Sequence, residues 1–137
     1  MAQDTQIPAP LTGIVPYVNV EGASAASEFY QKAFGAKELA RIPAEDGKRL
    51  MHCHLHINGG DVMISDCFPE HGHAFQSSSC FTLHQQLTDV DQAWDRAVAA
   101  GCEVIMPLEL MFWGDRYGIL VDPFQVRWSL ASTPAVA

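Results

Sequence analysis

The sequence predicts an α+β fold built from two βαβββ modules that together form a concave cleft. Apolar stretches rich in β-branched residues alternate with two segments whose apolar residues recur at helical spacing. The same order of elements occurs in each half of the chain, and a polar segment at residues 69–79 separates the halves. One module covers only one face of its sheet with its helix, so paired modules can enclose a cleft, where ligand sites are common.

The first module contains one helix and four strands. Residues 13–20 (GIVPYVNV) form the first predicted strand, and residues 22–36 form the helix, with Ser24 as its N-cap and Gly35 as its C-cap. Strands are expected at residues 37–43, 49–57 and 61–68. Asn58-Gly59 between the last two is typical of a hairpin turn.

The second module repeats this order. A strand at residues 80–87 precedes a helix at residues 88–101, which Thr88 and Asp91 open in a near capping box. Strands follow at residues 102–107, 117–122 and 126–131. We therefore expect a flexible N-terminal tail at residues 1–12, one domain at 13–132 and a C-terminal tail at 133–137. The modules would span residues 13–68 and 80–132.

Composition excludes several function classes. Sixteen acidic and eight basic residues give a net charge of −8, which disfavours nucleic acid and anionic membrane surfaces as partners. No apolar run reaches the roughly 18 residues needed to span a membrane. The N-terminus lacks the regions of a signal peptide, and the four cysteines form no CxxC pair. These features predict a cytoplasmic protein with free thiols.

Three histidines alternate along the strand at residues 49–57. His52, His54 and His56 share one face, and Met51, Cys53, Leu55 and Ile57 should face the helix. Because His52 and His56 would lie about 13 Å apart, only two neighbouring imidazoles could bind one metal ion. A third ligand, such as His84 or Asp66, would then be needed. The favoured alternative is a polar cleft wall in which the imidazoles bind neighbours or water.

Other side chains are candidates for the cleft. Strand alternation places Tyr17 and Asn19 on one face of the first module, and His84 and Gln86 on the equivalent face of the second. His52 and His84 are the candidates for general acid–base catalysis. Trp113 could stack on a planar ligand and Arg116 could clamp an anion, unless Arg116 pairs locally with Asp115 and Trp113 fills a core edge.

Three stretches carry a resemblance to a known family. VPYVNVEGASAASEFYQKAFGAKEL, MHCHLHINGGDVMISD and FWGDRYGILVDPFQVRWSLA resemble the vicinal-oxygen-chelate superfamily, which includes glyoxalase I, bleomycin-resistance proteins and extradiol dioxygenases. Within this superfamily the three stretches look like the PhnB-like branch, and the resemblance covers about residues 13–132. One departure is Gln125-Val126, where that branch usually has Gly-His.

The resemblance implies where a metal would bind. By strand pattern, the ligand positions of the superfamily's metalloenzymes correspond to Val15, Met63, Thr82 and Ser129. These side chains offer no imidazole or carboxylate. We therefore expect no metal cofactor, with a divalent metal at His52, His54 and His84 as the alternative.

The resemblance also implies a homodimer, with or without exchange of modules. The first functional hypothesis is a metal-independent protein of unassigned activity that binds a small molecule. Its expected binding residues lie on both modules: Tyr17, Asn19, His52, His54, His84, Gln86, Trp113 and Arg116. The alternatives are a metal-dependent glyoxalase-type lyase or isomerase, and a drug-sequestering resistance protein with an acidic, aromatic-lined cleft.

Overall fold

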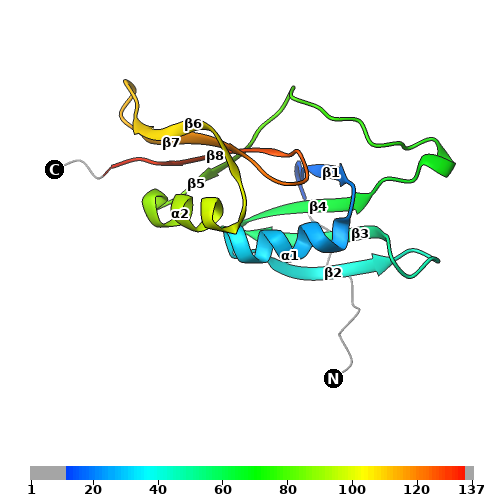
Figure 1. Ribbon diagram of the computed structural model, residues 1–137. Coiled ribbons are helices and arrows are strands. Elements are labelled where there is room, and N and C mark those ends of the chain that lie inside the picture. Colours follow the sequence, from blue (N-terminus) through cyan, green and yellow to red (C-terminus); the bar gives the residue numbers. More distant parts are fainter. Residues whose placement is uncertain (1–11, 135–137) are drawn as a thin grey trace. The chain divides into compact units, whose positions relative to one another are not determined.

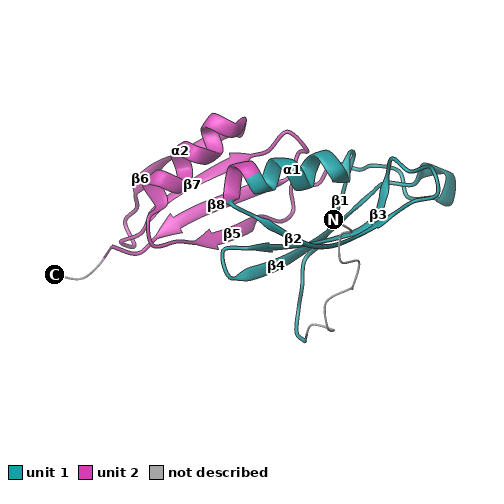
Figure 2. Ribbon diagram, turned by 90° about the horizontal axis from the view of Figure 1, so that it is seen from below, with its two compact units in different colours: residues 1–31, 35–76 teal, residues 32–34, 77–137 magenta. Residues whose placement is uncertain are grey.

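The computed structural model describes residues 12–134 and contains two four-stranded sheets, each with one helix (Figure 1). The predicted tails fall mainly outside these residues, at 1–11 and 135–137. The chain divides into two compact units (Figure 2): unit 1, residues 1–31 and 35–76, and unit 2, residues 32–34 and 77–137. The division between residues 76 and 77 lies inside the segment predicted to separate the modules. The α+β prediction is confirmed.

Unit 1 has the strand order β1-β4-β3-β2. Its strands are β1 (Tyr17–Val20), β2 (Lys37–Pro43), β3 (Leu50–Ile57) and β4 (Gly60–Asp66). The β1–β4 pair is parallel and the other pairs are antiparallel. The helix α1 (Ala23–Phe34) buries Ala23, Ala26, Ser27 and Tyr30, and the short helix η1 (Pro69–His71) follows β4. Small residues on the buried face of α1 allow the helix to approach its neighbours closely.

A carboxylate from the sheet caps α1, and the predicted Ser24 cap is wrong. The N-cap is Gly22, whose positive φ of 94° suits a residue without a Cβ atom. Asp66 of β4 accepts hydrogen bonds from the backbone N–H of Gly22 at 2.7 Å and Ala23 at 3.0 Å through Oδ1. Its Oδ2 accepts from Leu50 N at 2.7 Å. One buried side chain therefore ties the helix start to two strands.

The prediction for Met51 is also wrong. The β2–β3 register shifts between Ile42 and Pro43, so Leu50 occupies the buried position and Met51 is 56% exposed. Beyond this irregularity Cys53, Leu55 and Ile57 are buried, as the alternation predicts. Cys53 Sγ lies 3.3 Å from Glu38 Oε1, which also accepts from Ser27 of α1 at 2.7 Å. Burial raises the pKa of Cys53 to about 12, so this thiol stays protonated.

Unit 2 has the strand order β5-β8-β7-β6. Its strands are β5 (Leu83–Gln86), β6 (Glu103–Leu110), β7 (Arg116–Val121) and β8 (Arg127–Ser132), and the β5–β8 pair is parallel. Its helix α2 (Val90–Ala100) buries Val90, Trp94 and Ala97. The N-cap is Asp89, one residue after the predicted Thr88, and its side chain accepts from Gln92 N.

Unit 2 also contains the last turn of α1, residues 32–34. The Phe34 and Trp128 rings lie 4.5 Å apart, and Arg96 of α2 donates to the Lys32 carbonyl at 2.7 Å. Trp128 Nε1 donates to the buried Asp122 at 2.9 Å. In the turn that follows, Gln125 adopts a φ of 68°, a left-handed conformation that glycine would adopt with less strain. The turn forms despite the departure from Gly-His, because Gln125 N donates to Asp122 O at 3.1 Å and Asp122 N donates to Val126 O at 3.0 Å.

Candidate ligand-binding site

Unit 1 contains an open cavity of about 960 Å³. It lies where β1, β3 and β4 meet the segments 44–46 and 68–73. The lining residues are Tyr17, Asn19, Ala44, Glu45, Asp46, Arg49, Met51, Ser65, Asp66, Phe68, Glu70, His71 and His73. This volume is within the range typical of small-molecule sites.

Large apolar side chains are exposed on the cavity wall. Tyr17 is 50% and Met51 56% exposed. The register shift at the start of β3 is what turns Met51 away from α1. Tyr17 Oη lies 3.3 Å from Met51 O and 3.2 Å from His52 Nδ1, so the hydroxyl links β1 to β3. Asn19 Nδ2 donates to Ser65 Oγ at 2.7 Å.

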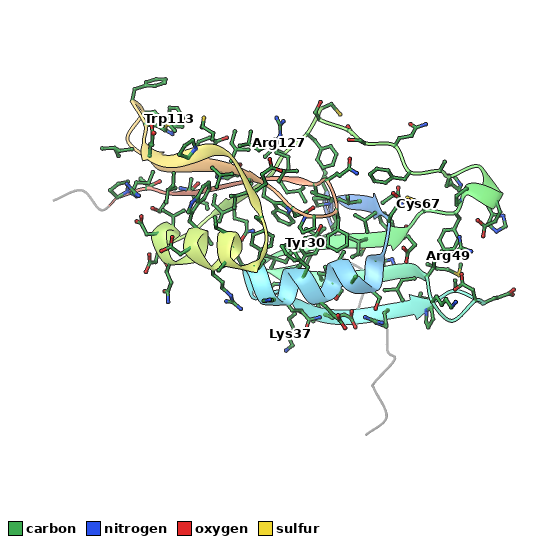
Figure 3. The ribbon with its side chains drawn as sticks, in the orientation of Figure 1. Tyr30, Lys37, Arg49, Cys67, Trp113 and Arg127 are labelled. Atoms are coloured by element: carbon green, nitrogen blue, oxygen red, sulfur yellow. The ribbon has the colours of Figure 1, made fainter. Side chains whose placement is uncertain are left out.

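Arg49, which is labelled in Figure 3, forms ion pairs with two of the carboxylates that line this cavity. Its guanidinium bonds Asp46 at 2.7 Å and Glu70 at 2.6 Å, and its Cζ lies 4.4 Å from the centre of the Phe68 ring. Backbone and side-chain hydrogen bonds from Arg49 and Lys48 lower the pKa of Asp46 to about 2. The side-chain bond from Arg49 lowers the pKa of Glu70 to about 2 as well. Both carboxylates therefore remain ionised at neutral pH.

The three histidines of β3 occupy different environments. His54 is 2% exposed, and its Nε2 lies 3.0 Å from Asp61 Oδ1. The same oxygen lies 3.2 Å from His56 Nδ1. Desolvation raises the pKa of Asp61, but the hydrogen bonds to His56 and His54 outweigh it and leave this pKa below its ordinary value. Burial, and then the nearby His54, lower the pKa of His52, which favours its neutral form.

Asp61 was missed in the sequence, although a signal was present. The Asn58-Gly59 turn pairs His56 with Asp61 across the hairpin, and such opposed residues lie within contact distance. The predicted third metal ligand in unit 1, Asp66, is instead fully engaged with three backbone N–H groups. Within residues 12–134, no group of three or more His, Cys, Asp or Glu side chains is arranged to hold a metal ion.

Unit 2 brings together a second set of predicted site residues. His84 Nδ1 lies 2.7 Å from Ser129 Oγ, and His84 Nε2 lies 2.8 Å from Gln86 Oε1. Gln86 Nε2 donates to Thr133 Oγ1 at 3.0 Å. In a neutral ring, Nε2 then donates to the amide oxygen while Nδ1 accepts the Ser129 proton.

An aromatic row adjoins this chain of hydrogen bonds. The His84 and Tyr117 rings are stacked with centres 6.0 Å apart, and the Trp113 ring meets Tyr117 edge-on at 5.6 Å. Trp113 is 51% exposed, so it does not fill a core edge. Such a surface is suited to a planar ligand.

Arg116 is engaged by a residue other than the predicted local partner. It binds Asp91 of α2 at 2.6 and 3.1 Å, and not Asp115. Arg116 points toward α2 because strand residues alternate, so that Arg116 shares its face of β7 with Gly118, which lies against Trp94 of α2. Arg116 therefore faces the helix, and this pairing occupies the guanidinium expected to clamp an anion.

The sequence matches the family described as the Glyoxalase/Bleomycin resistance protein/Dioxygenase superfamily over residues 13–130, and the chain belongs to this family. A relative, protein Mb0911c of Mycobacterium bovis, is 45% identical over 121 residues, which cover 84% of this chain and 79% of the relative. The predicted family membership is confirmed.

Solved structures of the same fold include TioX from Micromonospora sp. ML1, with 26% identity, a TM-score of 0.70 and coverage of 92% of this chain and 98% of TioX. The PhnB protein of Bacillus cereus has a TM-score of 0.72 at 20% identity, covering 89% of this chain and all of that protein. A mutant of the fosfomycin resistance protein FosX from Listeria monocytogenes, with Mn(II) and dihydroxypropylphosphonic acid, has a TM-score of 0.65 at 19% identity, covering 91% and 93%.

The residues of this chain do not fit a metal of the FosX kind. The positions that the resemblance assigns to metal ligands hold Val15, Met63, Thr82 and Ser129. Valine offers no donor atom, the Met63 thioether is a soft ligand, and Ser129 Oγ is bonded to His84. Manganese prefers carboxylate, carbonyl and water oxygens, which these side chains do not supply.

Proposed function

We propose that this member of the glyoxalase/bleomycin-resistance family binds a small amphipathic molecule in the unit 1 cavity without a metal. The observation that carries the proposal is the cavity of about 960 Å³ with Tyr17 and Met51 exposed on its wall. Covering about 100 Å² of apolar surface on these side chains would contribute about 2.5 kcal/mol to binding. Asn19 and Ser65 supply polar groups beside that surface.

The charge of the cavity favours a cationic ligand. Four carboxylates and one guanidinium line it, and the guanidinium already pairs with Asp46 and Glu70. Within this lining, Glu45 is a carboxylate for which the structure shows no hydrogen bond or ion pair. A solvated pair of charges about 4 Å apart contributes roughly 1 kcal/mol. Apolar contact would therefore supply most of the affinity, and charge would select among ligands.

Two ligands of the same carbon skeleton, one cationic and one neutral, test this proposal. By isothermal titration calorimetry, 2-naphthylmethylammonium should bind several-fold more tightly than 2-naphthylmethanol, since roughly 1 kcal/mol corresponds to about five-fold. Glu45→Gln should reduce this preference, and Tyr17→Ala should weaken both ligands. Glu103→Gln on β6 is the matched control. Equal affinities in the wild-type protein would refute the cationic preference, and no binding of either ligand would refute the site.

Drug sequestration is the second candidate function, and the same acidic, partly aromatic cavity favours it. A bleomycin-like cationic drug should then raise the melting temperature and be recovered chemically unchanged. Turnover of the bound molecule would instead indicate an enzyme. The metal-dependent lyase alternative finds no support in the side chains of the described residues.

We also infer that two copies of the chain pair through β6 and the turn that follows it. Exposed apolar side chains are concentrated there: Val104, Ile105, Leu110 and Phe112, the last 97% exposed. Phe112→Ser combined with Leu110→Ser should convert a dimer to a monomer in light scattering, and a monomeric wild-type protein would refute the proposed pairing.

The four free thiols support a reducing compartment such as the cytoplasm. No helix within residues 12–134 is long and apolar enough to cross a membrane.

A further inference from the structure

Unit 2 presents a sheet face that α2 does not cover, and an arginine lies on it. Trp128 and Leu130 of β8 are buried, and Trp128 packs against Phe34. Because strand residues alternate, Arg127 and Ser129 point to the opposite face. We call this opposite face, with His84, Gln86, Tyr117, Arg127 and Ser129, the helix-free face of unit 2. In Figure 3, Arg127 and Trp113 lie on the side of the sheet away from α2.

Arg127 differs from the other arginines of the chain. Arg41, Arg49 and Arg116 form ion pairs, and Arg96 donates to the Lys32 carbonyl. For Arg127 the structure of residues 12–134 shows no hydrogen bond or ion pair, although its neighbours on β8 are buried. A guanidinium that can form two parallel bonds to a carboxylate is therefore free to do so.

The residues beside Arg127 define the rest of a site. On β7, Val121 pairs with Arg127, Ile119 with Ser129, and Tyr117 with Ala131. Arg127 and Tyr117 thus lie about 13 Å apart along the face, with apolar Val121 beside Arg127 and Ile119 between the two ends. Trp113 extends the apolar end beyond Tyr117. The polar end and the aromatic end are separated by the span of a small aromatic acid once the reach of the arginine is included.

We propose that the helix-free face of unit 2 binds an aromatic carboxylate. Its carboxylate would pair with Arg127, and its ring would lie over Ile119 and Tyr117. Exposed His84, which is hydrogen-bonded to the buried Ser129, would flank its centre. Glu109 sits opposite Tyr117 and would repel a carboxylate from the aromatic end, which fixes the orientation. This inference does not depend on the cavity of unit 1.

The net charge of −8 opposes the binding of an anion beside Arg127 only weakly. At physiological ionic strength, exposed charges more than about 8 Å away are largely screened. A bidentate arginine–carboxylate pair acts at about 2.8 Å and is roughly twice as strong as a neutral hydrogen bond. Local pairing with Arg127 therefore outweighs the overall charge.

A matched pair of probes tests the proposal. In calorimetry, 2-naphthoate should bind the full chain at least about ten-fold more tightly than neutral 2-naphthamide, because a hydrogen bond to a charged group contributes roughly a factor of 10 to 100. Arg127→Gln should remove this difference, and Arg127→Lys should restore part of it. Arg96→Gln, in the same unit, is the charge-matched control and should bind like the wild type.

A second measurement locates the ring independently of affinity. In proton–nitrogen NMR spectra, 2-naphthoate should shift the indole signal of Trp113 but not that of Trp128, whose Nε1 is bonded to buried Asp122. Trp113→Phe assigns the signal. The proposal is overturned if naphthoate and naphthamide bind equally, if naphthoate fails to bind at millimolar concentration, or if Arg127→Gln retains the wild-type preference while folded.

Discussion

At the scale of single residues, two buried aspartates show how backbone groups determine the function of a carboxylate. Asp66 and Asp122 are 5% and 4% exposed, and each accepts hydrogen bonds from two or more N–H groups. The sequence suggested Asp66 only as a possible third metal ligand beside the histidines of β3. Only the tertiary structure shows that Asp66 caps a helix in another part of the chain, because its donors lie more than fifteen residues away.

We predict that Asp66→Asn destabilises the protein by about 1–3 kcal/mol. An amide keeps one acceptor oxygen, so its NH₂ group would face either Leu50 N or the two N–H groups at the start of α1. Urea unfolding followed by circular dichroism measures the change. Asp91→Asn, on an exposed ion pair, should cost less than about 1 kcal/mol; an equal loss in both variants would contradict the capping role.

Arg49 gives a prediction about pH. The folded-state pKa of Glu70 is lowered from 4.5 to about 2, so its stabilising contribution is present above pH 4.5 and is lost as the pH falls toward 2. In Arg49→Gln, the pKa of Glu70 should return toward 4.5. Asp46 should keep a lowered pKa, because backbone N–H groups hold it first. Carbon-13 NMR titration of the carboxylates measures both values, and parallel shifts would contradict this division.

At the scale of secondary-structure elements, periodicity predicts what forms but not every boundary. Residues 13–20 were predicted as one strand, whereas β1 begins only at Tyr17, directly after Pro16. The β6 strand continues to Leu110 instead of ending at Pro107, which an edge strand tolerates because it need not donate on its outer side. The displacement of Met51 arises from a register shift, and no pattern within β3 indicates it.

Gly118 gives a prediction about the contact between α2 and its sheet. A Cβ atom at this position would lie 2.5 Å from the Trp94 ring and 3.0 Å from Leu108 Cα. Gly118→Ala should therefore destabilise the protein by about 1–3 kcal/mol, as overpacking does. Gly60→Ala is the control, because its nearest contact would be an ordinary 3.7 Å. Thermal unfolding measures both variants, and equal melting temperatures would contradict the prediction and show that α2 can shift at little cost.

At the scale of the whole molecule, the same order of elements in both halves of the chain explains why the fold could be predicted from the sequence and the binding site could not. Each half repeats the same hydrophobic pattern, since each must cover a sheet with a helix. The equivalent positions of β1 and β5, however, hold Tyr17 and Asn19 in unit 1 but His84 and Gln86 in unit 2. The sequence did not indicate Asp61 or Arg49, because Asp61 depends on its cross-strand partner His56 and Arg49 on Glu70 beyond β4. The proposed role of Arg127 depends on its having no partner within residues 12–134, which the sequence cannot show.

The side chains at the expected metal-ligand positions lead to a prediction about metal binding. Protein purified without a nickel column should contain less than about a tenth of an equivalent of transition metal, and Zn²⁺, Ni²⁺ or Mn²⁺ should not raise its melting temperature. Elemental analysis and a thermal-shift assay measure these outcomes. Stoichiometric metal that His54→Ala removes would contradict the assignment and indicate a site at the paired histidines.

The cysteines differ sharply in accessibility, and this difference has an experimental use. Cys53, Cys67 and Cys102 are buried, and burial raises the pKa of all three thiols. Cys80 is exposed and lies just after the division between the units at residues 76 and 77. A maleimide dye should thus label the native chain once, without engineering. Its fluorescence anisotropy would then report directly on motion at the junction while ligands are added to either unit.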